Sequence, residues 1–312
     1  MTGPKIEAVI VTYNSAMHIR PCLTSLELNN ADTVVVDNGS KDETVAILKA
    51  EFPSVRVIAS GENLGYGKAL NRGIQETDSE FVLVANADTV FPDHSLQKLV
   101  DFLHGRQDVG VAGPQQIFPD GAWQRSFGEL PSLWQSLKMV TGITTLASAV
   151  ERMSWTYRAT RFPKRVGYVD GAVMMIRRAA FDAVQGFDES FHYYAEDIDI
   201  CLRLKEVGWE VFNVPGVTVI HVRGGSSTRV EGRSERLLEL QLKADTQLMK
   251  KHRSTWTIKP YIWMCRLHAY KMMLMYRMLA VCSADFSSSQ ADSLAKAFER
   301  EGRLWKDLTT HC

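Results

Sequence analysis

The stretch TVVVDNGSKDETVAILKAEFPSVRVIAS, residues 33–60, has the pattern of a strand, a helix and a second strand. TVVV and VRVIA are short, apolar and rich in β-branched residues, which favours strands. Between them, KDETVAILKAEF begins with acidic residues, whose charge favours a helix N-terminus. Continuous apolar strands joined by helices are typical of a parallel sheet with both faces covered. This stretch therefore predicts an α/β fold.

The first half of the chain repeats this alternation, which predicts a Rossmann-like, doubly wound and mostly parallel sheet flanked by helices. Residues 120–165 are less regular and are typical of an excursion from the sheet. After about residue 234 the chain reads as mostly helical, so we expect a helical C-terminal extension. Further strands are expected at residues 7–13, 81–88 and 109–115, and further helices at 18–28, 65–76 and 93–105.

Composition bounds the class of protein. The chain has 312 residues, 45% of them hydrophobic, which suits one large α/β domain with additions or two small domains. Lys plus Arg and Asp plus Glu both number 36, so the formal net charge is zero and no nucleic-acid partner is expected.

The cysteines and the N-terminus indicate the compartment. Five scattered cysteines show no C-x-x-C spacing, so we expect free thiols rather than a zinc knuckle or a redox pair. The N-terminal stretch has no signal-peptide pattern, and no run approaches about 20 apolar residues. We therefore expect a cytoplasmic protein without a spanning helix.

Polar residues follow three of the expected strands, and they should converge where the carboxyl ends of parallel strands meet. Each group alone also suits an Asx turn or a helix cap. All three together favour a ligand-binding edge. The groups are Thr12, Tyr13 and Asn14 after the first strand, Asp37 after the second, and Asn86, Ala87 and Asp88 after a later one.

Dinucleotide binding is disfavoured at this edge. A G-x-G-x-x-G fingerprint should follow the first strand, but TYNSAMH follows it and contains no glycine. A Walker P-loop is absent as well. The same lack of a glycine-rich and basic loop weighs against a nucleotidyltransferase.

The acidic residues point to chemistry on a nucleotide sugar. Asp37 can accept hydrogen bonds from a nucleoside, and Asp88 suits Mg²⁺ or Mn²⁺. Glu196, Asp197 and Asp199 open a predicted helix, where they are either a general base or an ordinary acidic helix start. His221 ends a strand and is either a metal ligand or a core histidine. As a set, these residues suit transfer of a sugar from a nucleoside diphosphate.

Several motifs resemble family 2 glycosyltransferases with the GT-A fold. VIVTYN, VVDNGSKDET, NLGYGKALNRG, VANAD, GFDESFHYYAEDIDICLRL and HVRGGSS occur in the family's order over roughly residues 5–230. With GPQQIFPDG and LPSL, the chain looks most like the bacterial rhamnosyltransferase branch. That resemblance implies a dTDP-rhamnose donor, a lipid-linked or cell-surface glycan acceptor, and an inverting displacement. A UDP-hexose donor and a non-catalytic sugar-nucleotide-binding protein remain alternatives.

The resemblance also implies roles for individual residues. Asp197 matches the catalytic base, Glu196 lies beside it at the acceptor, and Asp170 and Gly171 fall on the acceptor side. Asp88 matches the second acid of the D-x-D metal motif, and His221 a position that completes the metal site. The implied nucleotide-sugar set is Thr12, Tyr13, Asn14, Asp37, Asn63, Gly65, Asn71, Asn86, Ala87 and Asp88.

One position departs from the family pattern. Asn86 stands where the first acid of D-x-D is expected, so one carboxylate is left where two would share the cation. We therefore expect a metal dependence that is weaker or relies more on His221 and the diphosphate. Asp199, which could be confused with the base, is expected to be structural.

The resemblance divides the chain into a GT-A domain at 1–230 and a helical region at 231–312. The domain comprises a nucleotide-sugar half at about 1–115 and an acceptor half at about 116–230. Residues 259–282 mix Met, Tyr, Trp and basic side chains, which suits either a helix at a membrane surface or a core or homodimer helix. Both interpretations stay open, as does a location at the inner face of the plasma membrane.

Overall fold

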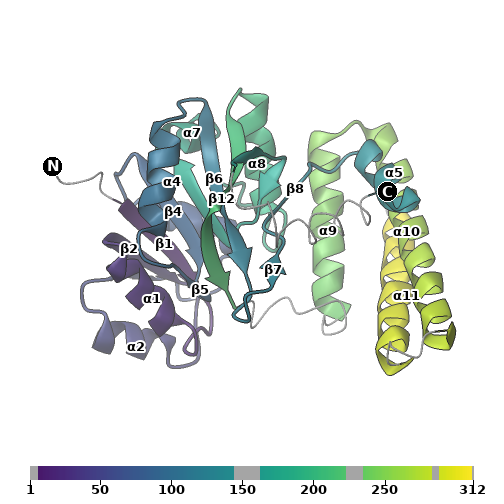
Figure 1. Ribbon diagram of the computed structural model, residues 1–312, viewed down its shortest axis with the longest axis horizontal. Coiled ribbons are helices and arrows are strands. Elements are labelled where there is room, and N and C mark those ends of the chain that lie inside the picture. The colour runs from purple at the N-terminus through teal and green to yellow at the C-terminus, as the bar shows by residue number, and fades with distance from the viewer. Residues whose placement is uncertain (1–5, 144–161, 223–234, 283–287, 311–312) are drawn as a thin grey trace. The chain divides into compact units, whose positions relative to one another are not determined.

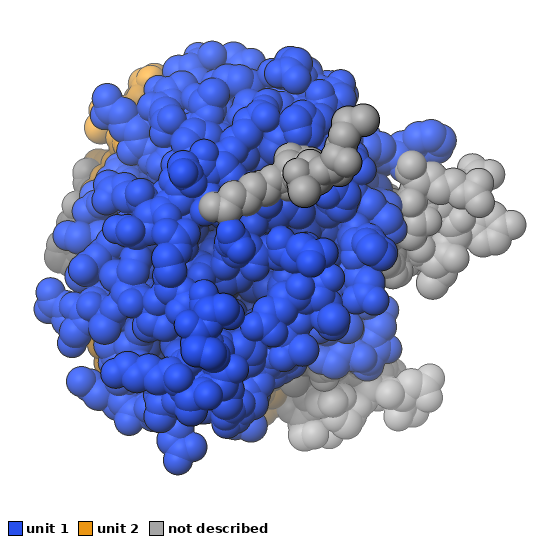
Figure 2. All heavy atoms as spheres, turned by 90° about the vertical axis from the view of Figure 1, so that its left-hand side faces the viewer, with its two compact units in different colours: residues 1–130, 155–222 blue, residues 131–154, 223–312 orange. Residues whose placement is uncertain are grey.

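The computed structural model describes residues 6–143, 162–222, 235–282 and 288–310. The chain forms two compact units, coloured separately in Figure 2. The first, here called the sheet unit, comprises Met1–Leu130 and Trp155–Val222. The second, the helical unit, comprises Pro131–Ser154 and Arg223–Cys312. Residues 131–143, assigned to the acceptor half by the resemblance, therefore group with the C-terminal helices.

The sheet unit is built on one mixed sheet, which can be followed in Figure 1. Its strands lie in the order β3-β2-β1-β4-β11-β6-β12-β5, with β7 paired to β6 and β9 to β12. The expected α/β fold is confirmed. The strands are β1 (Ile6–Thr12), β2 (Ala31–Asp37), β3 (Arg56–Ala59), β4 (Phe81–Asn86), β5 (Thr89–Val90), β6 (Val109–Ile117), β7 (Trp123–Gln124), β9 (Lys164–Arg165), β11 (Val173–Arg177) and β12 (Glu210–His221).

Strand direction is parallel through β3, β2, β1 and β4, and again between β6 and β12. Strand β11 lies between β4 and β6 and runs antiparallel to both. Its sequence, VMMIR, is buried throughout and so carries no alternation that would reveal direction. A separate small sheet pairs β8 (Phe127–Gly128) with β10 (Tyr168–Val169).

Helices cover both faces of the main sheet, because alternate residues of each strand point to opposite sides. One core contains Ile10 of β1 together with apolar residues of α1 (Ile19–Leu28), α2 (Thr44–Glu51) and α4 (Ser95–His104). The other contains Val9 of β1 and residues of α3 (Tyr66–Ile74), α7 (Arg178–Ala183) and α8 (Glu196–Glu206).

Strand register brings the polar strand ends to one edge. Thr12 lies opposite Asp37, and Val11 opposite Asn86. At the far side of the sheet, His221 lies opposite Thr89. Val222 also donates its N–H to the carbonyl of Asp88 at 2.9 Å. The expected convergence at the carboxyl edge is therefore present in the structure.

The helical unit contains α5 (Leu133–Thr141), α9 (Glu235–His252), α10 (Thr255–Cys282) and α11 (Ser288–Thr310). Its core includes Leu242, Ile262, Cys265 and Trp305. Lys271 of α10 donates to the carbonyls of Met139 and Val140 at 3.0 and 2.9 Å, which joins α5 to α10. Of the helices in the described part of the chain, none combines the length and apolarity needed to cross a bilayer.

Candidate active site

The ends of β1 and β2 form the first part of the site. Thr12 Oγ1 donates to Asp37 Oδ1 at 3.1 Å, and Asp37 Oδ2 accepts the Ser40 N–H at 3.1 Å. Asp37 is buried, whereas Tyr13 is 53% exposed. Asn14 has a φ of 51°, and its side chain accepts the Lys41 N–H at 2.7 Å. These contacts fix a turn beside Asp37, whose oxygens each keep a second lone pair.

A network of amides shapes the loop before α3. The Asn63 side-chain oxygen accepts both the Asn38 amide and the Gly65 N–H, each at 3.0 Å. Gly65 has a φ of 86°, and a Cβ there would lie 2.9 Å from two atoms of His192. Only glycine fits this close approach. Asn63 and Gly65 thus bring the start of α3 against the loop that precedes α8.

Asn71 has both side-chain atoms bound to protein. Its nitrogen donates to the Phe187 carbonyl at 2.8 Å, and its oxygen accepts the Phe187 N–H at 2.9 Å. The side chain therefore ties α3 to the turn that leads toward α8. The resemblance places Asn71 beside the nucleotide sugar, and the geometry supports a positioning role for it.

Asp88 and His221 meet at the carboxyl edge. His221 Nε2 lies 3.3 Å from Asp88 Oδ1, and the histidine is buried. On its other side, His221 Nδ1 lies 2.9 Å from Gln116 Oε1 and 2.8 Å from Gln124 Oε1. An amide oxygen can only accept, so Nδ1 carries the hydrogen. A neutral ring in this tautomer presents the lone pair of Nε2 to Asp88.

This donor pair fits a divalent cation. A carboxylate oxygen and an imidazole nitrogen are common ligands, and the glutamines orient the ring as a second shell does in metal sites. Within residues 6–143, 162–222, 235–282 and 288–310, no group of three or more His, Cys, Asp and Glu is arranged to hold a metal. A cation held here would thus take only two protein ligands from Asp88 and His221.

Asp197 is the second residue of α8 and is held by two backbone donors. Its Oδ2 accepts the Gly171 N–H at 2.9 Å, and its Oδ1 accepts the Ile198 N–H at 2.8 Å. Burial and the nearby Asp170 raise the pKa of Asp197, and the two backbone bonds oppose that rise. The carboxylate is therefore more basic than an exposed aspartate, while its position is fixed.

The two residues before α8 adopt an uncommon backbone. Tyr194 and Ala195 have φ values of 65° and 67°, in the left-handed region that favours glycine. Strain of this kind is concentrated at functional sites, where surrounding structure enforces it. Here it turns the chain so that Glu196 and Asp197 open the helix side by side.

Glu196 and Tyr66 lie in the same acidic neighbourhood. Burial and the charge of Asp197 raise the pKa of Glu196, whose Oε2 is buried and has no hydrogen-bond partner among the described residues. Tyr66 donates its hydroxyl to the Gly171 carbonyl at 2.9 Å. Burial, followed by the charges of Glu196, Asp170, Asp197 and Asp88, raises the pKa of Tyr66. All four acids are therefore close enough to act electrostatically on this phenol.

Asp199 has a different environment. It is buried, and its Oδ2 accepts the Arg203 Nε–H at 2.7 Å. Arg203 also donates to the carbonyls of Val184 and Gly186, which holds the end of α7. The geometry supports the structural role expected for Asp199.

The structure adds three residues that sequence reasoning missed. Tyr66, Gln116 and Gln124 bond to groups far away in the chain, so no local spacing could reveal them. Tyr66 lies within the motif NLGYGKALNRG, directly after Gly65, and this was the available signal. The two glutamines lie opposite each other on β6 and β7 and are fully buried, which is unusual for this residue type.

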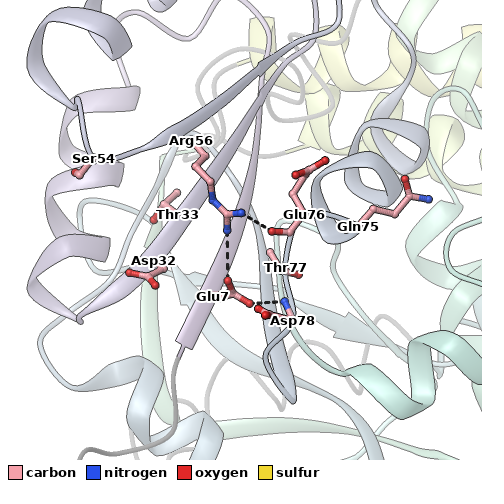
Figure 3. A pocket seen from close by; sticks show the side chains of 9 residues that line it. All are labelled: Glu7, Asp32, Thr33, Ser54, Arg56, Gln75, Glu76, Thr77 and Asp78. Atoms are coloured by element: carbon pink, nitrogen blue, oxygen red, sulfur yellow. Dashed lines mark hydrogen bonds and ion pairs between the residues drawn. The ribbon is translucent and has the colours of Figure 1, made fainter.

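A cavity of about 560 Å³ lies at the opposite, amino edge of the sheet (Figure 3). Its floor is the buried Glu7, which accepts the N–H groups of Asp78 and Ser79 and the Arg56 guanidinium. None of the predicted site residues lines it. The bonds to Glu7 give this acid a structural explanation, and the cavity is separate from the candidate site.

Comparison with protein families identifies the chain. The model of glycosyl transferase family 2 matches residues 7–184. The chain belongs to glycosyltransferase family 2. A second model, described as the N-terminal domain of galactosyltransferase, matches residues 151–223, which include Glu196, Asp197 and His221.

Curated relatives confirm the resemblance of this family 2 glycosyltransferase to rhamnosyltransferases. It is 34% identical to N-acetylglucosaminyl-diphospho-decaprenol L-rhamnosyltransferase of Mycobacterium tuberculosis, over 72% of this chain and 78% of that protein. It is 26% identical to dTDP-rhamnosyl transferase RfbF of Shigella flexneri, over 73% and 72% of the two chains. It is 22% identical to rhamnosyltransferase WbbL of Escherichia coli, over 68% of this chain and 81% of that protein.

Solved structures confirm the GT-A-like fold of the glycosyltransferase. The mannosyltransferase PcManGT of Pyrobaculum calidifontis, solved with GDP-Man and Mn²⁺, superposes with a TM-score of 0.58 at 14% identity, covering 97% of this chain and 87% of that one. GalNAc-T7, solved with UDP, GalNAc and Mn²⁺, superposes with a TM-score of 0.59 at 14% identity, covering 99% of this chain and 58% of that one. At this identity the likeness concerns the fold alone.

Proposed function

We propose that this glycosyltransferase moves rhamnose from dTDP-rhamnose to a hydroxyl of a lipid-linked saccharide. The three curated relatives are rhamnosyltransferases by name, and one name specifies dTDP-rhamnose as a donor type. The M. tuberculosis relative is named for an acceptor on decaprenyl diphosphate. These names support a dTDP-rhamnose donor and a polyprenyl-diphosphate-linked acceptor for this chain.

The placement of Asp197 carries the proposal for the chemistry. Its carboxylate is fixed by the N–H groups of Gly171 and Ile198, and its raised pKa makes it a stronger base than an exposed aspartate. In an in-line displacement, the acceptor oxygen bonds to the anomeric carbon while the bond to the diphosphate oxygen breaks. The acceptor proton passes to Asp197, and the departing nucleoside diphosphate keeps the electron pair. The anomeric configuration is inverted.

Asp88 and His221 would hold a divalent cation, Mg²⁺ or Mn²⁺, together with the diphosphate. Their 3.3 Å separation and the orientation of the imidazole fit that role. A bound cation neutralises charge that develops on the leaving diphosphate. Asn86 and Ala87 lie beside Asp88 at the end of β4, and Asn86 supplies no carboxylate. We therefore assign metal binding to Asp88 and His221 alone among the predicted residues.

The remaining site residues are assigned by their position in the sheet unit. Thr12, Tyr13, Asn14 and Asp37 are proposed to contact the nucleoside, with the exposed Tyr13 ring available to stack on the base. Asn63, Gly65 and Asn71 position the segment beside the donor. Glu196, Asp170 and Gly171 are proposed to face the acceptor, because they surround Asp197.

We also propose different roles for two parts of the chain. Residues 1–230, apart from residues 131–154 that group with the C-terminal helices, form the glycosyltransferase domain, with the donor half at about 1–115 and the acceptor half at about 116–230. Residues 231–312 are proposed to anchor the enzyme, in the cytoplasm, at the inner face of the plasma membrane where a lipid-linked acceptor would lie. A homodimer through the same region is the competing assignment.

A donor panel tests this function. The purified chain is incubated with dTDP-rhamnose, UDP-glucose and UDP-N-acetylglucosamine, each with Mg²⁺ or Mn²⁺ and a polyprenyl-diphosphate saccharide. Release of dTDP and a product heavier by one deoxyhexose are expected. Turnover with UDP-hexoses alone would replace rhamnose with the alternative donor. If added pyrophosphate is consumed and a nucleoside triphosphate and a sugar 1-phosphate are formed from the donor, the protein is a nucleotidyltransferase. Donor binding without any product would indicate a non-catalytic binding protein.

A further inference from the structure

Helix α10 has two apolar faces. Ile258, Ile262, Cys265, Ala269 and Met273 are buried inside the helical unit. On the other side of the helix, a second set of apolar side chains recurs at spacings of three, four and seven residues, as one helical face requires. These side chains are exposed, with Trp256 at 72% and Met278 at 67%. The set, called here the outer face, is Trp256, Trp263, Leu267, Tyr270, Leu274 and Met278.

A groove of about 480 Å³ borders the outer face between α10 and α11. Trp263, Tyr270 and Phe298 contribute aromatic walls to it. Its basic residues are Arg266, Arg277, Arg303 and Lys306, against the single acid Glu299. Glu299 pairs with Arg277 at 2.9 Å and with Arg303 at 3.4 Å. The three arginines alone outnumber this carboxylate, so the lining of the groove carries more positive than negative side chains.

We infer that the outer face and its basic groove bind the surface of a bilayer that contains anionic lipids. Trp and Tyr prefer the interfacial region of a membrane, and leucine and methionine enter its apolar boundary. Arg and Lys beside such a face contact anionic headgroups. Aromatic and aliphatic side chains of α10 lie beside basic side chains of α10 and α11, which matches a pair of helices lying in the plane of the interface.

The charge pattern disfavours a second copy of the chain as the occupant. A two-fold dimer brings the same patch of both copies together. Contact through this face would place the cations of one groove near those of the other. Anionic headgroups instead complement this surplus. This role deepens the anchoring proposed above for residues 231–312 and rests on it, but it does not depend on the sugar or on the acceptor.

Vesicle cosedimentation of the full-length chain, without donor or acceptor, tests the inference. Vesicles of phosphatidylcholine with an equal part of phosphatidylglycerol are compared with vesicles of phosphatidylcholine alone. We expect binding to the anionic vesicles and much weaker binding to the neutral ones. Binding to neither kind of vesicle would overturn the proposal.

Two double variants separate the apolar and the electrostatic parts. Trp263→Ser with Tyr270→Ser should weaken binding to anionic vesicles by about tenfold or more. Arg266→Gln with Lys306→Gln should weaken it by about fivefold per charge and reduce its dependence on salt. All four side chains border the groove, and Trp263 and Tyr270 are exposed, so the variants should fold as the wild type does.

Matched controls lie in the sheet unit. Leu28→Ser removes an exposed apolar side chain of α1, and Lys49→Gln removes an exposed charge of α2. Both should bind vesicles as the wild type does. Unchanged binding by the two double variants would reject the outer face. A dimer in light scattering that Trp263→Ser with Tyr270→Ser dissociates would assign the face to a second copy and overturn the membrane proposal.

Discussion

His221 Nε2 lies 3.3 Å from Asp88 Oδ1, while Nδ1 of the same ring faces the side-chain oxygens of Gln116 and Gln124. Two lone pairs that face each other at this distance are unfavourable unless a proton or a cation lies between them. The glutamines therefore do more than fill the interior. They select the tautomer in which Asp88 and His221 can share a cation.

Removing this orientation should weaken metal binding. Gln116→Leu with Gln124→Leu is expected to lower the affinity for Mn²⁺, in the presence of dTDP, by about ten- to a hundredfold, because Nδ1 of the imidazole then loses both of its acceptors. Electron paramagnetic resonance of free Mn²⁺ measures the effect without turnover. Gln107→Leu, at an exposed position, is the control. Wild-type affinity in the double variant would show that the two glutamines are not needed for binding of the cation.

Gly171 should be required for the position of Asp197. A Cβ at residue 171 would lie 3.1 Å from the Asp197 Cβ, so the aspartate has to shift by a few tenths of an ångström. Gly171→Ala is expected to lower kcat by about ten- to a hundredfold with little change in donor affinity.

The control for that change is Gly216→Ala, since a Cβ at residue 216 meets no atom within 4 Å. Steady-state kinetics and calorimetric donor binding measure the two quantities. Equal kcat values for the two alanine variants would contradict a positioning role for Gly171.

Substitution of Asp197 should lower activity, whereas substitution of Asp199 should lower stability. Asp197→Asn is expected to lower kcat by about 10² to 10⁴, because the general base is lost, and to leave donor affinity within about twofold. Asp199→Asn should instead cost on the order of 3 kcal/mol of unfolding free energy, because it breaks the buried pair with Arg203. Urea unfolding and kinetics distinguish them. If Asp199→Asn loses turnover at full stability, the base assignment passes to Asp199.

Glu196 should make the sheet unit less stable as pH rises. Burial and the charge of Asp197 raise the pKa of Glu196 to about 8 from the ordinary 4.5. Between these two values the folded chain holds a proton that the unfolded chain has released. Unfolding free energy therefore falls as pH rises through this window, and the full cost is present above pH 8.

Glu196→Gln removes this titration. The variant should match the wild type at about pH 4 and exceed it at pH 8 by an amount on the order of a few kcal/mol. Urea unfolding across this pH range measures the difference. A difference that does not vary with pH would show that the pKa of Glu196 is the same in the folded and the unfolded chain.

The carboxyl edge was predictable because parallel strands align their ends. Thr12, Asp37 and Asn86 follow apolar runs, and the register of β1 with its two neighbours places them together. The antiparallel direction of β11 was not predictable, since a fully buried strand looks the same in either direction. The grouping of α5 with α10 was hidden for a related reason: it depends on contacts such as Lys271 to Met139, across 131 intervening residues.

Some residues of the candidate site could likewise be predicted from the sequence, and others could not. Asp88, Asp197 and His221 stand out in the sequence because acids and a histidine end apolar segments or begin a helix. Gln116 and Gln124 do not stand out, because polar residues in strands normally face water. Only the pairing of β6 with β7 and with β12 reveals that both glutamines meet His221.

The place of β11 between β4 and β6 also sets the order in which the chain can fold. When the ribosome has made β6, β4 is paired only with β1, and the strand that later joins β4 to β6 is missing, because β11 begins only at Val173. Two open strand edges must wait for a distant segment, which slows folding and exposes the edges to other chains. A nascent chain that ends before Arg177 would therefore be the species most prone to aggregate.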